Sequence, residues 1–314
     1  MLLEAPARTQ DYPFRPKKRI RHAPHFWMTE RDEEVIEAVY RYRVLDRPQI
    51  ERLFFATRNR TRERLRLLYL HGYLERVTRM VYPGVPSRGP AYRLAARGAK
   101  FLSGRTGVSL AEMHYWGKGD DKDSRQTQVG HLFLEHMIAI ADIHIAFDQA
   151  VRSKLCTIEN WRDDMDMRHA RDWDSVEIET SPGAKRKRIP VTPDSYFLLA
   201  TPRSRGHFFV EGDRATETIA AAWKRKILAY KEYMRSGLFH TRYEVMQPQT
   251  GFRVLTVTSS WQRAQNLKAA AERYGSPELA QLFLFAPFED VDAQDVLTAP
   301  IWLRGGTTGR QALL

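Results

Sequence analysis

The stretch Val191–Asp213, VTPDSYFLLATPRSRGHFFVEGD, decides the fold of the longer, C-terminal part of the chain. Within it, residues 191–199 and residues 207–213 are rich in β-branched, aromatic and other apolar side chains, which predicts two strands. The link between them is short, and a link of that kind suits a hairpin. The segment therefore predicts a pair of neighbouring strands.

Helices and strands alternate on both sides of this hairpin. The spacing of apolar residues predicts helices over about 128–151, 216–235 and 261–273, and strands over about 156–161, 252–258 and 282–285. Residues 162–190 are highly charged and predicted to be irregular. The order of elements predicts a mixed α/β domain over residues 128–304, followed by a tail over residues 305–314.

The first third of the chain has a different pattern. It predicts three short helices and then two short strands, over about 29–41, 47–55, 59–70, 73–77 and 91–94. Thr29 can cap the first helix, and Pro48 fits the first turn of the second. This is the layout of a winged helix-turn-helix domain, expected over residues 29–110. A flexible basic arm over residues 1–28 and a linker over residues 111–127 are expected to flank it.

Arginines recur at every second position along the predicted third helix, which would be the recognition helix of such a domain. Arginine pairs bidentately with phosphates and with guanine edges, and helix-turn-helix domains place this helix in the major groove of DNA. Basic residues of the predicted wing and of the arm are further candidates. The predicted DNA-binding residues are Arg58, Arg60, Arg62, Arg64, Arg66, Arg79, Arg88, Lys17, Lys18 and Arg19.

The charge of the chain is concentrated at its N-terminal end. Of the formal net charge of +12, residues 1–100 contribute +11, and such a segment attracts a polyanion such as double-stranded DNA. The single cysteine, Cys156, excludes an internal disulfide and a cysteine-rich zinc site. Since no apolar run is long enough to cross a membrane and no signal peptide is recognised, we expect a cytoplasmic protein without membrane contacts.

The acidic residues of the central hairpin carry a resemblance to a known family. Pro193-Asp194, followed by Glu211-x-Asp213 at the end of the next strand, resembles the PD-(D/E)xK nuclease pattern. The segment 209–217, a Lys and a Tyr on the next helix, and Pro300-Ile301-Trp302 resemble the replication-relaxation family of plasmids and other mobile elements. This likeness spans residues 30–304. It implies a winged helix followed by a restriction-endonuclease-like domain, and a role in plasmid replication or topology.

The resemblance implies a metal site, but this sequence departs from the family's motif at one position. Asp194, Glu211 and Asp213 would hold Mg²⁺ or Mn²⁺, since hard carboxylate oxygens suit these ions. Asp213, however, occupies the place of the motif's lysine. Lys226 falls on the inward face of the following helix, where a lysine needs an acidic partner. Either the site is degenerate, or a lysine has migrated to this helix and Asp194, Glu211, Asp213 and Lys226 are catalytic.

Three functions therefore remain open at this stage. The leading hypothesis is a protein that binds double-stranded DNA of a plasmid or other mobile element, acting in replication, relaxation or transfer, with a degenerate nuclease-like domain. The alternatives are an Mg²⁺-dependent endonuclease that cuts near the winged-helix site, and a transcription regulator whose second domain dimerises. Other expected partners are a second copy of the chain and replication or transfer proteins.

Overall fold

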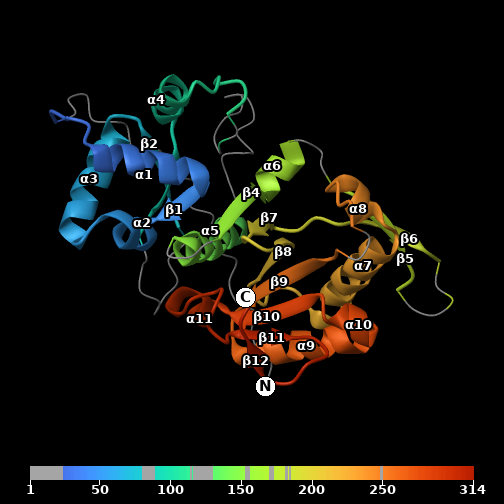
Figure 1. Cartoon of the computed structure of the whole chain (residues 1–314). Coiled ribbons are helices and arrows are strands. Elements are labelled where there is room, and N and C mark those ends of the chain that lie inside the picture. Colours follow the sequence, from blue (N-terminus) through green and yellow to red (C-terminus); the bar gives the residue numbers. More distant parts are fainter. Residues whose placement is uncertain are drawn as a thin grey trace, which may run out of the picture. The chain divides into compact units, whose positions relative to one another are not determined.

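The computed structural model describes residues 24–79, 89–113, 115, 130–152, 156–169, 173–180, 183, 185–247 and 250–314. The chain divides into two compact units, residues 1–131 and residues 132–314. The fold is mixed, with helices and sheets in both units (Figure 1).

The first unit contains three helices, a three-stranded antiparallel sheet of order β1-β3-β2, and a fourth helix. Its elements are α1 (Glu30–Arg41), β1 (Val44–Asp46), α2 (Arg47–Phe54), α3 (Arg58–Leu70), β2 (Leu74–Val77), β3 (Ala91–Leu94) and α4 (Ala96–Thr106). The succession of α1 to β3 is consistent with the predicted winged helix.

Local sequence signals account for where these helices begin. The side chain of Thr29 caps α1 in a reciprocal arrangement with Asp32, and Asp46 and Gln49 form the same arrangement at the start of α2. Pro48 lies in the first turn of α2, as expected. Strand β1 was not predicted, because three residues are too few to show alternation. Helix α4 lies in a segment for which no helix was predicted.

A buried ion pair joins two helices of the first unit. Arg64 on α3 donates from Nε to Oδ1 of Asp32 on α1 over 2.9 Å, and its Nη2 reaches the other carboxylate oxygen. Nη2 also donates to the carbonyl of Trp27 over 3.0 Å, and the guanidinium lies over the ring of Phe26. Asp32 is fully buried. Residues 24–28, predicted to end a flexible arm, thus contact α3 through these groups.

The second unit begins with the long helix α5 (His131–Val151), whose first residue is the last of the first unit. It continues with β4 (Thr157–Asp163), α6 (Asp164–His169), β5 (Ser175–Ile178), β6 (Lys187–Pro190), β7 (Ser195–Ala200), β8 (Arg205–Asp213), the π-helical turn η1 (Ile219–Trp223), α7 (Lys224–Arg235), α8 (Leu238–Arg242), β9 (Phe252–Thr258), α9 (Trp261–Tyr274), α10 (Pro277–Ala280), β10 (Phe283–Pro287), α11 (Phe288–Ala293), β11 (Trp302–Arg304) and β12 (Arg310–Gln311).

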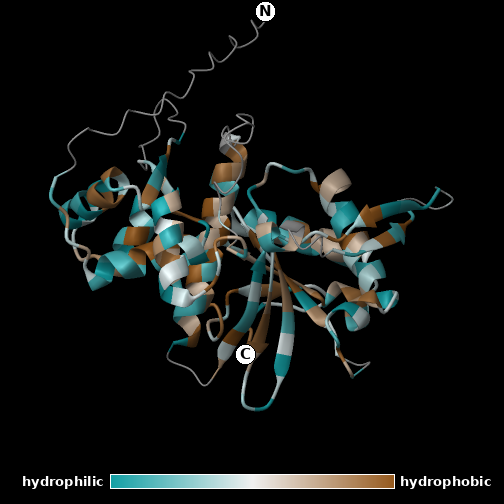
Figure 2. Ribbon diagram, turned by 90° about the horizontal axis from the view of Figure 1, so that it is seen from above, coloured by the Kyte–Doolittle hydropathy of each residue, from teal (hydrophilic) through white to brown (hydrophobic). Residues whose placement is uncertain are grey.

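A seven-stranded sheet of order β12-β11-β10-β9-β8-β7-β4 forms the centre of this unit. Strands β8, β9 and β10 are parallel, and the other pairs are antiparallel. One hydrophobic cluster packs α7 and α9 on one face, through residues such as Ile227 and Leu267. A second cluster packs α5 and α11 on the other face, through Phe147 and Val291. Hydrophobic stretches run through the strands between these layers (Figure 2).

The second unit differs from the sequence prediction in several places, since α8, α10, α11 and β11 lie in segments for which no helix or strand was predicted. Residues 162–190, predicted to be irregular, contain α6 and the two-stranded sheet of β5 and β6. The pairing of β5 with β6 buries Val176 and Ile178 against α7. The charged sequence of residues 162–190 does not indicate this contact. Residues 305–314, predicted as a tail, contribute β12 to the central sheet, and Leu313 packs in its core. Among the described helices, none has the length and apolarity needed to span a membrane.

Candidate functional site: buried carboxylates at one end of the sheet

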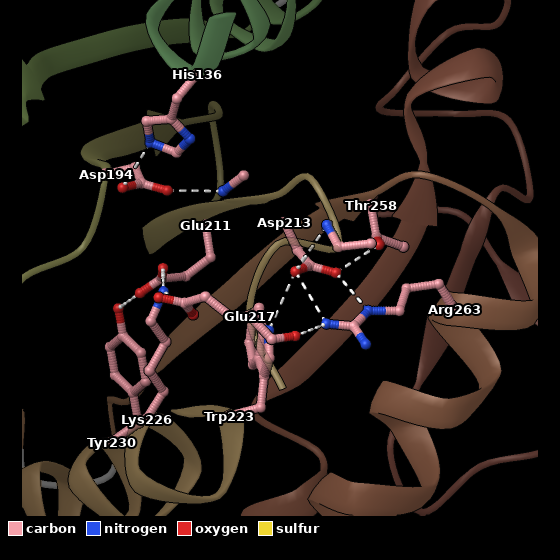
Figure 3. Close-up of polar contacts among 12 residues, drawn as sticks. His136, Asp194, Glu211, Asp213, Glu217, Trp223, Lys226, Tyr230, Thr258 and Arg263 are labelled. Carbon is pink, nitrogen blue, oxygen red and sulfur yellow. Dashed lines mark hydrogen bonds and ion pairs between the residues drawn. The ribbon is translucent and has the colours of Figure 1, made fainter. Parts of the chain in front are cut away.

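Three predicted site residues lie where β7 begins and β8 ends. The antiparallel register places Ser195 opposite Val210, so Asp194 comes close to the residues that follow Val210. Side chains of a strand alternate between its faces, so Glu211 and Asp213 point toward α7 and α9. Gly212 faces α5, since a Cβ atom there would meet Ile140 at 2.8 Å. The carboxylates therefore have separate surroundings, which Figure 3 shows.

Asp194 is bound by a histidine and a backbone amide. His136 on α5 lies with Nε2 3.0 Å from Oδ1, and the N–H of Gly212 donates to Oδ2 over 2.8 Å (Figure 3). Burial lowers the pKa of His136, but the hydrogen bond and charge of Asp194 outweigh burial and raise it. Burial raises the pKa of Asp194, but His136, Lys226 and the Gly212 amide together lower it. The pair is therefore stabilised in its charged form.

Glu211, which is 2% exposed, is bound by two side chains of α7. Tyr230 donates its hydroxyl to Oε1 over 2.7 Å, and Lys226 donates to Oε2 over 2.9 Å. The ammonium group also lies 3.4 Å from a carboxylate oxygen of Glu217 and over the ring of Trp223. Burial lowers the pKa of Lys226, but the charges of Glu211, Asp194 and Glu217 raise it strongly. Lys226 is therefore a permanent cation beside this carboxylate.

Asp213 is the most extensively hydrogen-bonded of the three. Its Oδ2 accepts from Thr258 over 2.7 Å and from Nε of Arg263 over 2.8 Å. Its Oδ1 accepts from Nη2 of Arg263 and from the indole N–H of Trp223, each over 3.2 Å. Burial raises the pKa of Asp213, but these hydrogen bonds and the charge of Arg263 lower it. Asp213 thus fixes η1 and α9 to the end of β8.

The three carboxylates, with the hydrogen bonds that they make in this structure, do not fit a divalent cation. Every oxygen of Asp194, Glu211 and Asp213 already accepts from a protein donor, and Lys226, His136 and Arg263 supply positive charge where a metal would. Among the described residues, no three or more His, Cys, Asp or Glu side chains are arranged to hold a metal ion. The carboxylates would have to lose these partners before they could coordinate Mg²⁺ or Mn²⁺.

The sequence indicated some of this arrangement. Lys226 was expected to point inward toward the acidic cluster, and the structure places it against Glu211. Tyr230 is four residues from Lys226 and therefore lies on the same face of the helix. This spacing could have indicated that Tyr230 also donates to Glu211. His136 shares the apolar face of α5, where a polar residue needs a partner. Nothing in the spacing of the sequence indicated Arg263, since it comes from a distant helix.

The predicted DNA-binding residues fall into separate groups. Arg58, Arg60, Arg62 and Arg66 are exposed on α3, and Arg60 pairs with Glu63. Arg64 is 8% exposed and bound to Asp32, because every second residue of a helix cannot stay on one side of it. Arg79 forms an ion pair of 2.6 Å with Asp46. The remaining candidates, Lys17, Lys18, Arg19 and Arg88, lie outside the described residues.

The fold and these sites define a protein with an arginine-faced helical unit and a mixed α/β unit that carries buried carboxylates. The chain belongs to the replication-relaxation family, whose model matches residues 36–248. A search of curated proteins found no match. Among solved structures, the chain is similar to the restriction endonuclease FokI bound to DNA, with 11% identity and a TM-score of 0.25. That alignment covers 84% of this chain and 43% of the FokI chain.

Proposed function

We propose that this protein binds double-stranded DNA through α3 and acts on plasmid or other mobile DNA in replication, relaxation or transfer. The observation that carries the proposal is the exposed arginine face of α3. Arg58, Arg62 and Arg66 are exposed there, while Leu65 and Leu68 pack in the core. A helix held by one face and basic on the other suits insertion into the major groove.

The buried arginine supports this use of the helix. Arg64 ties α3 to α1 through Asp32, so the exposed arginines project from a helix whose position is fixed. A helix that is already held in place loses less freedom when its arginines pair with phosphates or with guanine edges. Membership of the replication-relaxation family favours plasmid or other mobile DNA as the target.

We expect the double substitution Arg62→Ala and Arg66→Ala to weaken binding to duplex DNA and to flatten its salt dependence. Each lost phosphate contact reduces the slope of log affinity against log salt by about one, so the slope should fall by about two. Fluorescence anisotropy with a labelled duplex at several salt concentrations measures both effects.

The matched control is the double substitution Arg225→Ala and Arg235→Ala, which removes two exposed arginines of α7 in the second unit. It should leave the salt slope close to that of the wild-type protein. Equal affinities and slopes for the α3 variant and the wild type would contradict the proposal.

We further propose that the acidic site of the second unit is degenerate and does not cleave DNA. Lys226 and His136 neutralise Glu211 and Asp194 internally. Arg263 does the same for Asp213, which occupies the place of the motif's lysine. A site in which each carboxylate already has a cationic partner favours a structural role over metal-dependent hydrolysis.

A supercoiled plasmid should therefore stay supercoiled when it is incubated with the protein and either Mg²⁺ or Mn²⁺, as judged by agarose gel electrophoresis. The Asp194→Ala variant, assayed in parallel, separates the protein's own activity from a contaminating nuclease. Metal-dependent nicking by the wild type that Asp194→Ala abolishes would overturn this proposal and establish the endonuclease alternative.

A further inference from the structure

A second feature of the α/β unit lies at the other end of β8. A cavity of about 510 Å³ opens there, where Gly206 and His207 of β8 meet Phe252 and Arg253 of β9. Since a strand rises about 3.3 Å per residue, the four residues from His207 to Glu211 and the six to Asp213 place the cavity about 13–20 Å from these two carboxylates. Its volume is within the range of small-molecule sites.

Two arginines give this cavity its electrostatic character. Arg253 on β9 and Arg304 on β11 both line it. Burial and the nearby charge of Arg304 lower the pKa of Arg253. Among the described residues, no carboxylate lies within ion-pair distance of either guanidinium, and Arg304 donates Nε to the carbonyl of Gln281 over 3.0 Å. Two like charges that line one half-buried cavity repel each other, and a bound anion would offset that repulsion.

The rest of the lining is partly polar and partly apolar. Thr201, Ser204 and Thr250 bring hydroxyl groups, and leucines and Phe208 form an apolar wall. Arg205 also lines the cavity, but it is largely exposed and lies 3.5 Å from a carboxylate oxygen of Glu159. Glu278 is the one lining residue with an acidic side chain, and it is exposed. The interior is therefore cationic on one side and apolar on the other.

We propose that this cavity binds a nucleotide through its phosphate group, with the guanidinium groups of Arg253 and Arg304 on the phosphate and the organic part against the apolar wall. Arginine pairs bidentately with phosphate oxygens, and a cavity of this size exceeds what an inorganic ion fills. The phosphate belongs either to a free nucleotide or to the 5′ end of a DNA strand. The inference is independent of DNA binding by α3, because it concerns a different unit.

The test is isothermal titration of the full chain with deoxyadenosine 5′-monophosphate, with deoxyadenosine and with inorganic phosphate. The monophosphate should bind more tightly than either of the other two. The Arg253→Gln variant should weaken its binding by about tenfold or more, the usual effect of losing a charge-assisted pair. Arg225→Gln, which removes an exposed arginine of α7, is the matched control and should leave binding unchanged.

Two oligonucleotides of the same sequence, one with and one without a 5′-phosphate, distinguish a free nucleotide from a DNA strand end as the source of the phosphate. Tighter binding of the phosphorylated strand than of both the unphosphorylated strand and the monophosphate identifies a strand end. Equal binding of the two strands, with tighter binding of the monophosphate than of deoxyadenosine, identifies a free nucleotide. Equal binding of deoxyadenosine and its monophosphate, no binding of any phosphate at millimolar concentration, or equal affinities of Arg253→Gln and the wild type would each overturn the proposal. The comparison among ligands of the wild type stands even if the variant does not fold.

Discussion

Replacement of Asp213 by Ala is expected to cost the second unit about 3–5 kcal/mol of unfolding free energy, the usual penalty for removing one partner of a buried ion pair. The carboxylate is 4% exposed and accepts from Arg263, Thr258 and Trp223. Its removal leaves a cation and two neutral donors without their acceptor at the end of β8. Urea unfolding followed by tryptophan fluorescence measures the loss, since Trp223 is among the donors.

The matched control is Glu177→Ala on β5, an exposed acidic position where the change should stay within about 0.5 kcal/mol. The pH dependence gives a second check. Since the folded state lowers the pKa of Asp213, its contribution to stability is present above the ordinary Asp pKa and is lost as the pH falls through the lowered value. The Asp213→Ala variant should not show this loss of stability as the pH falls. A variant as stable as the control would show that the pairing with Arg263 is not structural.

Replacement of Arg64 by Met should destabilise the first unit by a similar amount, about 3–5 kcal/mol. Asp32 would stay fully buried without its cation, and α3 would lose its link to α1 and to the carbonyl of Trp27. Hydrogen exchange of the backbone amides of α1 and α3 measures this effect. Exchange should be faster in the variant because local opening becomes easier.

The control for this substitution lies two residues away on the same helix. Arg62 is exposed, so Arg62→Ala should leave exchange in α1 and α3 almost unchanged while weakening DNA binding. The two substitutions thus distinguish the effect of Arg64 on stability from the effect of Arg62 on DNA binding. If Arg64→Met left exchange rates as they are in the wild type, the buried pair would contribute nothing measurable to the unit.

Much of the fold could be predicted because its signals are local. Thr29 and Pro48 mark helix starts through hydrogen bonding and a fixed backbone angle, and both lie where expected. The strands on either side of the central hairpin follow from runs of apolar residues. The pairing of β5 with β6 and of β12 with β11 could not be foreseen, since these strands are short and their partners, not their own residues, stabilise them.

The candidate site was only partly accessible for the same reason. Helical periodicity placed Lys226 on an inward face, and the structure puts it 2.9 Å from Glu211. The sequence predicts that all five arginines of α3 bind DNA, yet burial separates Arg64 from its neighbours. The cavity with Arg253 and Arg304 left no local signal, because the two residues are 51 positions apart and meet only through the sheet.

The amino-acid order alone predicted a two-part organisation, and it gave the concentration of basic charge in the first third and the acidic residues of the hairpin, since composition and periodicity act over short distances along the chain. The folded arrangement assigned a cationic partner to each buried carboxylate of the candidate site. Arg263 reached Asp213 and His136 reached Asp194 from other elements. Whether a buried charge serves stability or chemistry depends on the neighbours that exclude water from it, and those neighbours are brought together only by long-range packing.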